Sequence, residues 1–227
     1  MNDLAIPEKA VLVYSGGLDS TTLLYLLHKG GCKVKALGFD YGQRHVKELG
    51  AAANICQELG VPYEVLDLSG LRKLLPGSSQ TDQNVEVPEG HYEAESMKLT
   101  VVPNRNMIML AVAAGHAIAN DIEWVAYAAH AGDHAIYPDC RPSFVQALEH
   151  AFSKCDWKEV HLYAPFVMFT KDKGDIAALG ATLGIPYAKT WTCYKGLEKH
   201  CGVCGSCRER KDAFTKAGIA DPTEYLA

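Results

Sequence analysis

Two groups of residues in this sequence have types and spacings suited to chemistry. The first is Ser15-Gly16-Gly17-Leu18-Asp19-Ser20, which stands between a short apolar run and a leucine-rich stretch. Glycines let a phosphate approach the backbone closely, and a helix start offers unpaired N–H groups and the positive end of its dipole. The hexapeptide therefore predicts a phosphate-binding loop. Asp19 is expected either to cap the helix or to hold a magnesium ion bound to the phosphate.

The second group is a cluster of four cysteines near the C-terminus, namely Cys193, Cys201, Cys204 and Cys207. Two overlapping Cys-x2-Cys spacings, with a glycine inside each, let the thiolates turn toward one ion. Four soft ligands favour zinc or an iron–sulfur cluster over hard cations, and redox-active thiols are a further alternative. Zinc is the preferred interpretation. Its role is expected to be structural, because four thiolates leave no open coordination position.

The composition excludes several classes of protein. The chain has 227 residues, of which 48% are hydrophobic and 22% charged, so it is neither disordered nor collagen-like. Its formal net charge of −5 argues against a generic nucleic-acid coat protein. The first residues lack the basic start and apolar core of a signal peptide, and no apolar run approaches the ~20 residues of a membrane helix. We expect a cytoplasmic protein whose cysteines are mostly reduced.

Alternating apolar patterns predict the elements that position these groups. Strands are expected over 10–14, 34–39, 63–68, 124–127 and 160–164, and helices over 19–29, 46–59, 106–119, 143–152 and 172–183. This alternation predicts an α/β fold with a doubly wound, mostly parallel, Rossmann-like sheet. Residues 1–189 are expected to form the ATP-binding domain, with 190–227 as a small zinc-binding segment packed on it. The long polar stretch 75–102 is expected to be either a functional lid or disordered.

Further motifs stand at the predicted carboxyl ends of strands or beside the cysteines. They are 39-FDYGQR-44, 102-VPNRN-106, 137-YPDCR-141 and 190-TWTCY-194. The hexapeptide at 15–20 resembles the PP-loop of the N-type ATP pyrophosphatases. All these motifs together, from Val11 to about Arg208, resemble the 7-cyano-7-deazaguanine synthase family. The resemblance implies an adenine nucleotide alpha-hydrolase-like fold.

The resemblance also implies a reaction. Members of this family convert the carboxylate of 7-carboxy-7-deazaguanine to a nitrile with ATP and ammonia, on the route to queuosine or archaeosine. A carboxylate oxygen is a poor leaving group, so adenylation of the carboxylate, and then of the intermediate amide, is the expected chemistry. ATP, magnesium and one structural zinc per subunit are implied. A homodimer without direct nucleic-acid binding is the expected assembly.

Roles for individual residues follow from the same resemblance. The nucleotide is expected to contact Tyr14, Ser15, Gly16, Gly17, Leu18, Asp19, Ser20, Thr21, Asp40 and Arg44. Arg105, Lys173 and Asp133 are the candidate catalytic residues, with Asn106 as a weaker candidate beside Arg105. Tyr137, Asp139 and Arg141 are expected to bind the substrate. Either Asp133 or Asp139 would accept hydrogen bonds from the N–H groups of its guanine-like edge. His45, His130 and His134 are candidate general bases toward ammonium.

Two other functions are compatible with parts of the sequence. The PP-loop also suits a tRNA thiolation enzyme or another amidating enzyme, although a thiolation enzyme needs a catalytic cysteine pair and Cys140 is a single candidate. A zinc-knuckle RNA-binding module would use the basic residues around the cysteines, which are Lys195, Lys199, Arg208, Arg210 and Lys211. The acidic chain and the few aromatic residues among those charges argue against the second alternative.

Overall fold

Five parallel strands form one sheet, and the strand order reverses beside the first strand. The computed structural model describes residues 5–226, apart from the side chains of His134 and Ala135. The strands are β1 (Lys9–Val13), β2 (Lys33–Asp40), β3 (Tyr63–Asp67), β4 (Trp124–Ala126) and β5 (His161–Tyr163), in the order β3-β2-β1-β4-β5. β1 is central, because Val11 pairs with Lys35 of β2 on one side and with Val125 of β4 on the other. Ligands of open α/β sheets bind at the carboxyl edge beside such a reversal.

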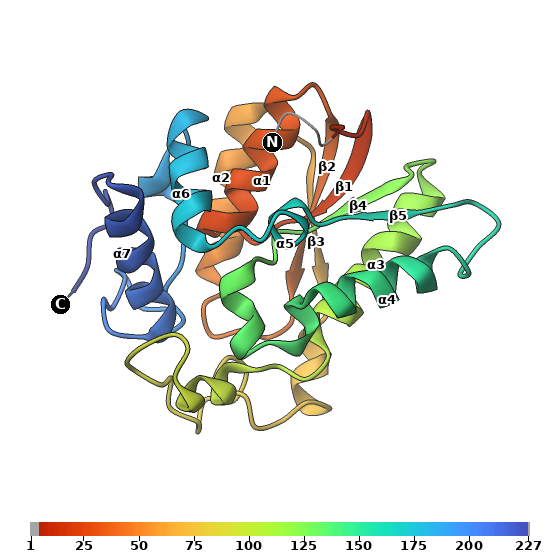
Figure 1. The fold of residues 1–227 in the computed structure, drawn as a ribbon. Coiled ribbons are helices and arrows are strands. Elements are labelled where there is room, and N and C mark those ends of the chain that lie inside the picture. Colours follow the sequence, from red (N-terminus) through yellow and green to blue (C-terminus); the bar gives the residue numbers. More distant parts are fainter. Residues whose placement is uncertain (1–4, 227) are drawn as a thin grey trace.

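Helices cover both faces of the sheet, as the alternating pattern predicts (Figure 1). They are α1 (Leu18–Lys29), α2 (Lys47–Leu59), α3 (Arg105–Ala119), α4 (Pro142–Phe152), α5 (Pro165–Met168), α6 (Lys173–Thr182) and α7 (Gly205–Ala217). Within the described part of the chain, no helix is long and apolar enough to cross a membrane.

Two hydrophobic cores lie on opposite faces of the sheet, because successive side chains of a strand point in opposite directions. On β1, Val11 belongs to the core under α3 and α4, whereas Ala10 and Leu12 belong to the core under α1, α2 and α6. Both cores bury long apolar runs of the kind that parallel strands carry. The predicted α/β class and mostly parallel sheet are therefore confirmed.

The predicted elements are present with small shifts at their ends, but α7 and the short α5 were not predicted. The buried residues of α7 are mostly small or polar, namely Gly205, Ser206, Cys207, Arg210, Ala213 and Phe214. Such a face gives little apolar periodicity, so the sequence pattern does not indicate a helix there. α7 packs beside α6 at one end of the molecule (Figure 1).

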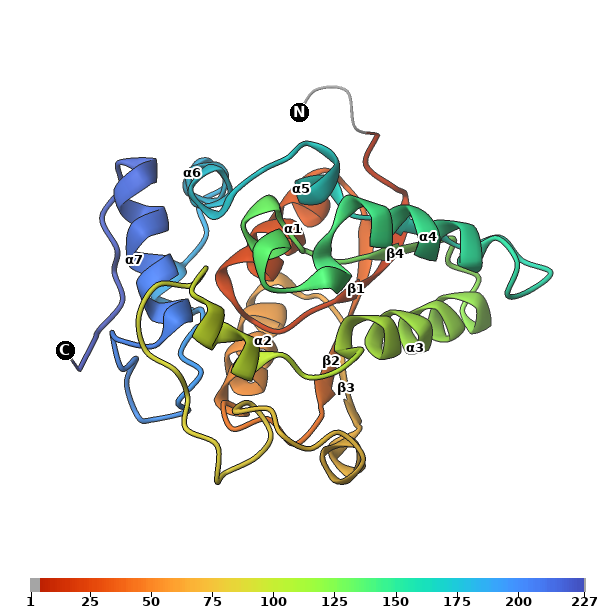
Figure 2. The ribbon, with the colours of Figure 1, turned by 60° about the horizontal axis from the view of Figure 1, so that its bottom comes forward.

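The polar stretch 75–102 follows a defined path. Of the two alternatives, a functional lid and a disordered loop, the second does not apply. It passes the carboxyl ends of the strands and runs close to α7 (Figure 2), where Gly90 donates a backbone hydrogen bond to Val203. The guanidinium of Arg44 holds its first half, donating to the backbone oxygens of Ser79, Asp82 and Val85 at 3.2, 2.8 and 2.9 Å. We call residues 75–102 the covering segment.

Gly16 offers a test of how tightly the phosphate-binding loop packs. Its φ is +78°, and a Cβ there would lie 2.7 Å from both the backbone nitrogen of Ala52 and the backbone oxygen of Glu48 on α2. Gly31 has a similar φ of +85° but nothing within 4 Å of its Cβ position. We expect Gly31→Ala to lower the free energy of unfolding by about 1 kcal/mol and Gly16→Ala by about 3 kcal/mol or more. Urea denaturation measures both, and equal losses would contradict the close packing of α2 on the loop.

Candidate functional site

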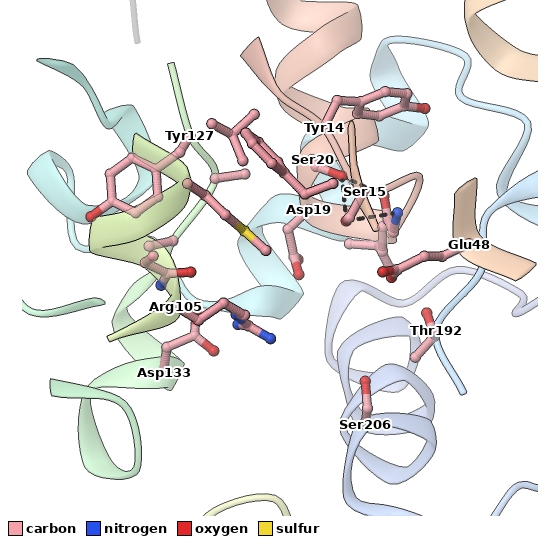
Figure 3. A pocket seen from close by; sticks show the side chains of 18 of the residues that line it. Tyr14, Ser15, Asp19, Ser20, Glu48, Arg105, Tyr127, Asp133, Thr192 and Ser206 are labelled. Carbon is pink, nitrogen blue, oxygen red and sulfur yellow. Dashed lines mark hydrogen bonds between the residues drawn. The ribbon is translucent and has the colours of Figure 1, made fainter. Parts of the chain in front are cut away.

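A cavity of about 220 Å³ lies at the carboxyl edge of the sheet, beside the reversal of strand order (Figure 3). Its walls come from the loop after β1, the ends of β2 and β4, the start of α3 and the C-terminal segment. The residues predicted from the sequence that line it are Tyr14, Ser15, Gly17, Leu18, Asp19, Ser20, His45, Arg105, Asn106, Asp133, Tyr137 and Lys173. The fold thus brings together most of the candidate catalytic and nucleotide-binding residues.

The loop after β1 has the local geometry of a phosphate site. The hydroxyl oxygens of Ser15 and Ser20 lie 3.1 Å apart, and the Gly17 N–H donates to Ser15 Oγ at 3.3 Å. Gly17 occupies the N-cap position of α1, and no side chain caps that helix. Its first N–H groups are therefore available to an anion. Thr21 is an exception among the predicted contacts, because its buried hydroxyl lies 3.2 Å from that of Tyr14, inside the core.

Asp19 does not cap α1, which removes one of its two expected roles. Its Oδ2 lies 3.1 Å from Nζ of Lys173, and its Oδ1 is buried without a hydrogen-bond partner. Lys173 begins α6 and also donates to Glu209 Oε2 on α7 at 2.5 Å. Burial lowers the pKa of Lys173, but the surrounding carboxylates raise it by a larger amount. Its pKa therefore lies above the ordinary value, and the ammonium form is strongly favoured. Glu209 was missed in the sequence because α7 was missed.

His130 faces the same carboxylates from the turn after β4. Its Nε2 lies 3.6 Å from Asp133 Oδ2, 3.8 Å from Asp19 Oδ2 and 3.8 Å from Glu209 Oε1. Its Nδ1 accepts the Gly132 N–H at 3.1 Å, which places the ring proton of the neutral form on Nε2, toward the carboxylates. This tautomer opposes a role for Nε2 as a base. The side chain of His134 lies outside the described part of the structure.

Asp133 is held in its ionised form. Its Oδ1 accepts the hydroxyl of Tyr92 at 2.9 Å, and its Oδ2 accepts the backbone N–H of His130 at 3.2 Å. Burial raises the pKa of Asp133, but the charges of His130 and Lys173 and these hydrogen bonds outweigh burial, so its pKa lies below the ordinary value. Ligand atoms of His130, Asp133 and Glu209 lie within 4.8 Å of one another, a spacing compatible with a shared cation.

Arg105 enters the cavity from the first turn of α3 (Figure 3). Its guanidinium lies 5.7 Å from the centre of the Tyr41 ring, and its Nη1 donates weakly to the Tyr41 hydroxyl at 3.4 Å. A guanidinium held by so few partners keeps donors available for a carboxylate or a phosphate. Tyr137 forms another wall of the cavity, with its hydroxyl 2.5 Å from that of Thr100 in the covering segment.

Seven of the described residues that were predicted for catalysis or for nucleotide or substrate binding do not line the cavity, namely Gly16, Thr21, Asp40, Arg44, His130, Asp139 and Arg141. Asp40 accepts the Gly42 N–H at 2.9 Å, and Arg44 binds the covering segment as described above. Asp139 accepts the backbone N–H of Asn106 at 3.2 Å, so it fixes the start of α3, and Arg141 is exposed. The nucleotide-binding roles of Asp40 and Arg44 and the substrate-binding roles of Asp139 and Arg141 stay predictions.

Glu48 lines the cavity and was missed by the sequence reasoning. Its Oε2 lies 3.5 Å from His45 Nε2, and its Oε1 accepts Gln43 Nε2 at 3.0 Å. Burial raises the pKa of Glu48 to about 7, and burial lowers the pKa of His45 to about 3. Glu48 follows His45 by three residues at the start of α2, so the i,i+3 spacing was the available signal.

The four cysteines predicted as metal ligands are buried together, and their sulfur atoms lie within 4.8 Å of one another. Backbone N–H groups of Cys201 and Cys204 donate to the sulfurs of Cys193 and Cys201 at 3.3 and 3.2 Å. Such hydrogen bonds stabilise thiolates. Hydrogen bonding within the cluster lowers the pKa of Cys193 far below its ordinary value. The donor set and its spacing fit one soft or borderline metal ion.

The cysteine segment is joined firmly to the phosphate-binding loop. The backbone N–H of Trp191 donates to the carbonyl of Gly16 at 3.0 Å. Arg210 on α7 is fully buried and donates to Thr190 Oγ1 at 2.8 Å, to Thr192 Oγ1 at 3.1 Å and to the Tyr187 carbonyl at 3.0 Å. These bonds fix the stretch that leads into the cysteines.

Comparisons with known proteins show which proteins the chain is similar to in sequence and in fold. The sequence profile of the family described as queuosine biosynthesis protein QueC matches residues 9–218. The 7-cyano-7-deazaguanine synthase of Methanoregula boonei is 55% identical over 96% of this chain and 99% of that protein. The 7-cyano-7-deazaguanine synthase 1 of Colwellia psychrerythraea is 52% identical over the same shares. A solved structure, the U34-tRNA thiolase NcsA of Methanococcus maripaludis with its 4Fe-4S cluster, is alike in fold, with a TM-score of 0.51 at 18% identity. The match covers 92% of this chain and 64% of the thiolase chain.

Removing the charge of Lys173 tests the carboxylate cluster. In Lys173→Gln, the carboxylates of Asp19, Asp133 and Glu209 face one another without a cation, so folding raises their pKa values. A group whose pKa rises on folding contributes stability below its unfolded pKa, near pH 4, and loses it as the pH increases. We therefore expect a loss of about 3 kcal/mol at pH 7.5 and a smaller loss at pH 5, measured by urea denaturation.

Lys158→Gln is the matched control, because Lys158 pairs with Asp121 on the surface. Such exposed pairs contribute at most about 1 kcal/mol, so this control should change little at either pH. Equal losses in the two variants would show that the buried cluster does not depend on Lys173.

Proposed function

The chain belongs to the QueC family of queuosine biosynthesis proteins, and we propose that it converts 7-carboxy-7-deazaguanine and ammonia to 7-cyano-7-deazaguanine with ATP. It is an ATP-dependent carbon–nitrogen ligase of the queuosine or archaeosine route. One observation carries the proposal: a single cavity joins the phosphate-binding loop at Ser15–Ser20 to the guanidinium of Arg105. A nucleotide triphosphate and a substrate carboxylate can therefore meet there.

The first step activates the carboxylate. An oxygen of the substrate carboxylate attacks the α-phosphorus of ATP, and the bond from that phosphorus to the bridging oxygen breaks. Pyrophosphate leaves with the electron pair of that bond. The hydroxyls and N–H groups of the loop bind it. Arg105 holds the carboxylate in the bidentate manner that suits a guanidinium. Lys173, beside Asp19 in the loop, balances the charge that develops on the leaving group.

The second and third steps form the nitrile. Ammonia attacks the acyl adenylate, AMP leaves, and the nitrogen gives up one proton, which yields the amide. The amide oxygen then displaces pyrophosphate from a second ATP. Loss of AMP and of two N–H protons forms the carbon–nitrogen triple bond. Asp133 and Tyr137, which both line the cavity, bind and orient the guanine-like edge of the substrate.

Two metal ions complete the proposal. Zinc suits the four cysteines, because tetrahedral ligands at ~2.3 Å stand about 3.8 Å apart, and the sulfurs of Cys201 and Cys207 are 3.9 Å apart. An iron–sulfur cluster spreads its thiolates wider, around several iron atoms. Magnesium would accompany the ATP phosphates, with the buried, unpartnered Oδ1 of Asp19 as its protein ligand. Zinc supplies structure there, and magnesium neutralises phosphate charge.

The location, the assembly, the partners and the domain division belong to the same proposal. We take the enzyme to be a cytoplasmic homodimer that acts on free small molecules and does not bind tRNA directly. We also take 1–189 as the ATP-binding domain and 190–227 as the zinc-binding segment. The hydrogen bond from Trp191 to Gly16 supports a close association of the two parts.

A thiolation activity has less support. Among the described residues that line the cavity, Cys140 is the single cysteine. Burial raises its pKa well above the ordinary value, which disfavours the nucleophilic thiolate.

The direct test of function is a mass-spectrometric assay of the purified chain with 7-carboxy-7-deazaguanine, ATP, magnesium and ammonium. We expect the nitrile to appear together with AMP and pyrophosphate. Formation of the amide alone would keep the activation chemistry and contradict the dehydration step. No consumption of the deazaguanine would refute the proposed substrate.

The metal assignment has its own test. We expect elemental analysis to find one zinc and no iron per chain, and Cys204→Ser to lose most of that zinc. Because the cysteines fix α7, the variant should also unfold at a lower temperature than the parent. Cys155→Ser is the control, since Cys155 is exposed and distant from the cluster in sequence. Stoichiometric iron would overturn the zinc assignment.

A further inference from the structure

We propose that His45 and Glu48 form the binding subsite for ammonium, the second substrate of the proposed reaction. The inference rests on the proposed function and adds to it the place where the nitrogen nucleophile is held. The two residues lie in the turn after β2 and the start of α2, and both line the cavity. Glu48 is placed beside the phosphate-binding loop (Figure 3).

The first evidence is an unpartnered acceptor. His45 is 4% exposed, and its Nδ1 is buried without any hydrogen-bond partner. Its Nε2 lies 3.5 Å from Glu48 Oε2, so in the neutral ring Nε2 carries the proton and Nδ1 presents a lone pair. A buried lone pair without a donor is costly, and native proteins usually satisfy it with a ligand or a water. A small hydrogen-bond donor such as ammonium would satisfy this atom.

The second evidence is the carboxylate beside it. The side chain of Glu48 is 12% exposed, Gln43 donates to its Oε1, and His45 Nε2 faces its Oε2 at 3.5 Å, so acceptor capacity remains on both oxygens. The rings of Tyr41 and Tyr194 flank His45, with centroids 6.5 and 5.4 Å from the imidazole. An anionic carboxylate, a lone pair and aromatic rings together suit a small cation that donates several hydrogen bonds.

The position of the subsite fits the chemistry that follows. Arg105, which holds the substrate carboxylate in the proposed reaction, stacks on the same Tyr41 ring that flanks His45. Its positive charge disfavours a second cation close by and so favours loss of a proton from ammonium. Because folding raises the pKa of Glu48 to about 7, its carboxylate can take that proton near neutral pH.

The proton and electron balance of the step is simple. Ammonium transfers one proton to the carboxylate of Glu48 and becomes ammonia. The nitrogen lone pair forms the new bond to the acyl carbon, and the bond from that carbon to AMP breaks with its electrons on the phosphate oxygen. The nitrogen then releases a second proton to water, and the amide remains.

The experiment compares two reactions in the same variants. Conversion of the carboxylate to the nitrile requires ammonium, whereas conversion of the 7-deazaguanine carboxamide to the nitrile requires ATP but no ammonium. We expect Glu48→Gln and His45→Leu to raise the KM for ammonium about 10- to 100-fold, as for the loss of a charge-assisted hydrogen bond. The KM for ATP and the rate with the carboxamide should stay at the wild-type values.

His45→Asn is the conservative variant, because the amide oxygen of asparagine can occupy the position of Nδ1. It should retain most of the affinity for ammonium that His45→Leu loses. Glu64→Gln, on the exposed part of β3, is the charge-matched control and should behave as the wild type.

The outcomes separate this inference from the proposed function. A wild-type chain that makes no nitrile from either substrate would overturn the proposed function, and the subsite with it. If the wild type is active but Glu48→Gln and His45→Leu slow both reactions equally, the two residues are structural and the subsite is overturned alone. A raised KM for ATP instead of ammonium would place the nucleotide there and would also overturn it.

Discussion

The ammonium group of Lys173 connects three parts of the chain that are far apart in sequence. It contacts Asp19 in the phosphate-binding loop and Glu209 on α7, and Lys173 itself begins α6. All three side chains are largely buried, so each charge needs the others to offset its loss of hydration. This contact joins the loop, α6 and α7 at the edge of the cavity, which Asp19 and Lys173 line. Asp133 and His130 extend the same charged cluster to the end of β4.

The cysteine segment contributes to the site and not merely to the stability of the tail. Its first residues bind the backbone of the loop through Trp191, and its helix delivers Glu209 to Lys173. Arg210, the next residue of α7, is fully buried and donates to the hydroxyls of Thr190 and Thr192 and to the carbonyl of Tyr187. Two consecutive residues of α7 thus contact Lys173 on one side and the stretch from Tyr187 to Thr192 on the other.

The sequence predicted the sheet, its strands and the glycine turn between β1 and α1 because these depend on local apolar runs and on glycines at one turn. It predicted that the four cysteines gather because their spacing is local as well. It did not predict Glu48 or Glu209, whose roles arise from contacts across the fold. Arg44 is a charged residue of a predicted site motif, but it donates hydrogen bonds to the backbone of the covering segment. The sequence could not show this contact, because it depends on the folded path of that segment.

The hydrogen bond between Trp191 and Gly16 joins residues that leave the ribosome at very different times. Domains can begin to fold during synthesis, and β1 and α1 on either side of Gly16 precede the other described strands and helices in the sequence. Their partner Trp191, and Glu209 after it, follow every strand of the sheet in the sequence. The contacts that Trp191 makes with the loop and Glu209 makes with Lys173 therefore form only after all five strands have been synthesised.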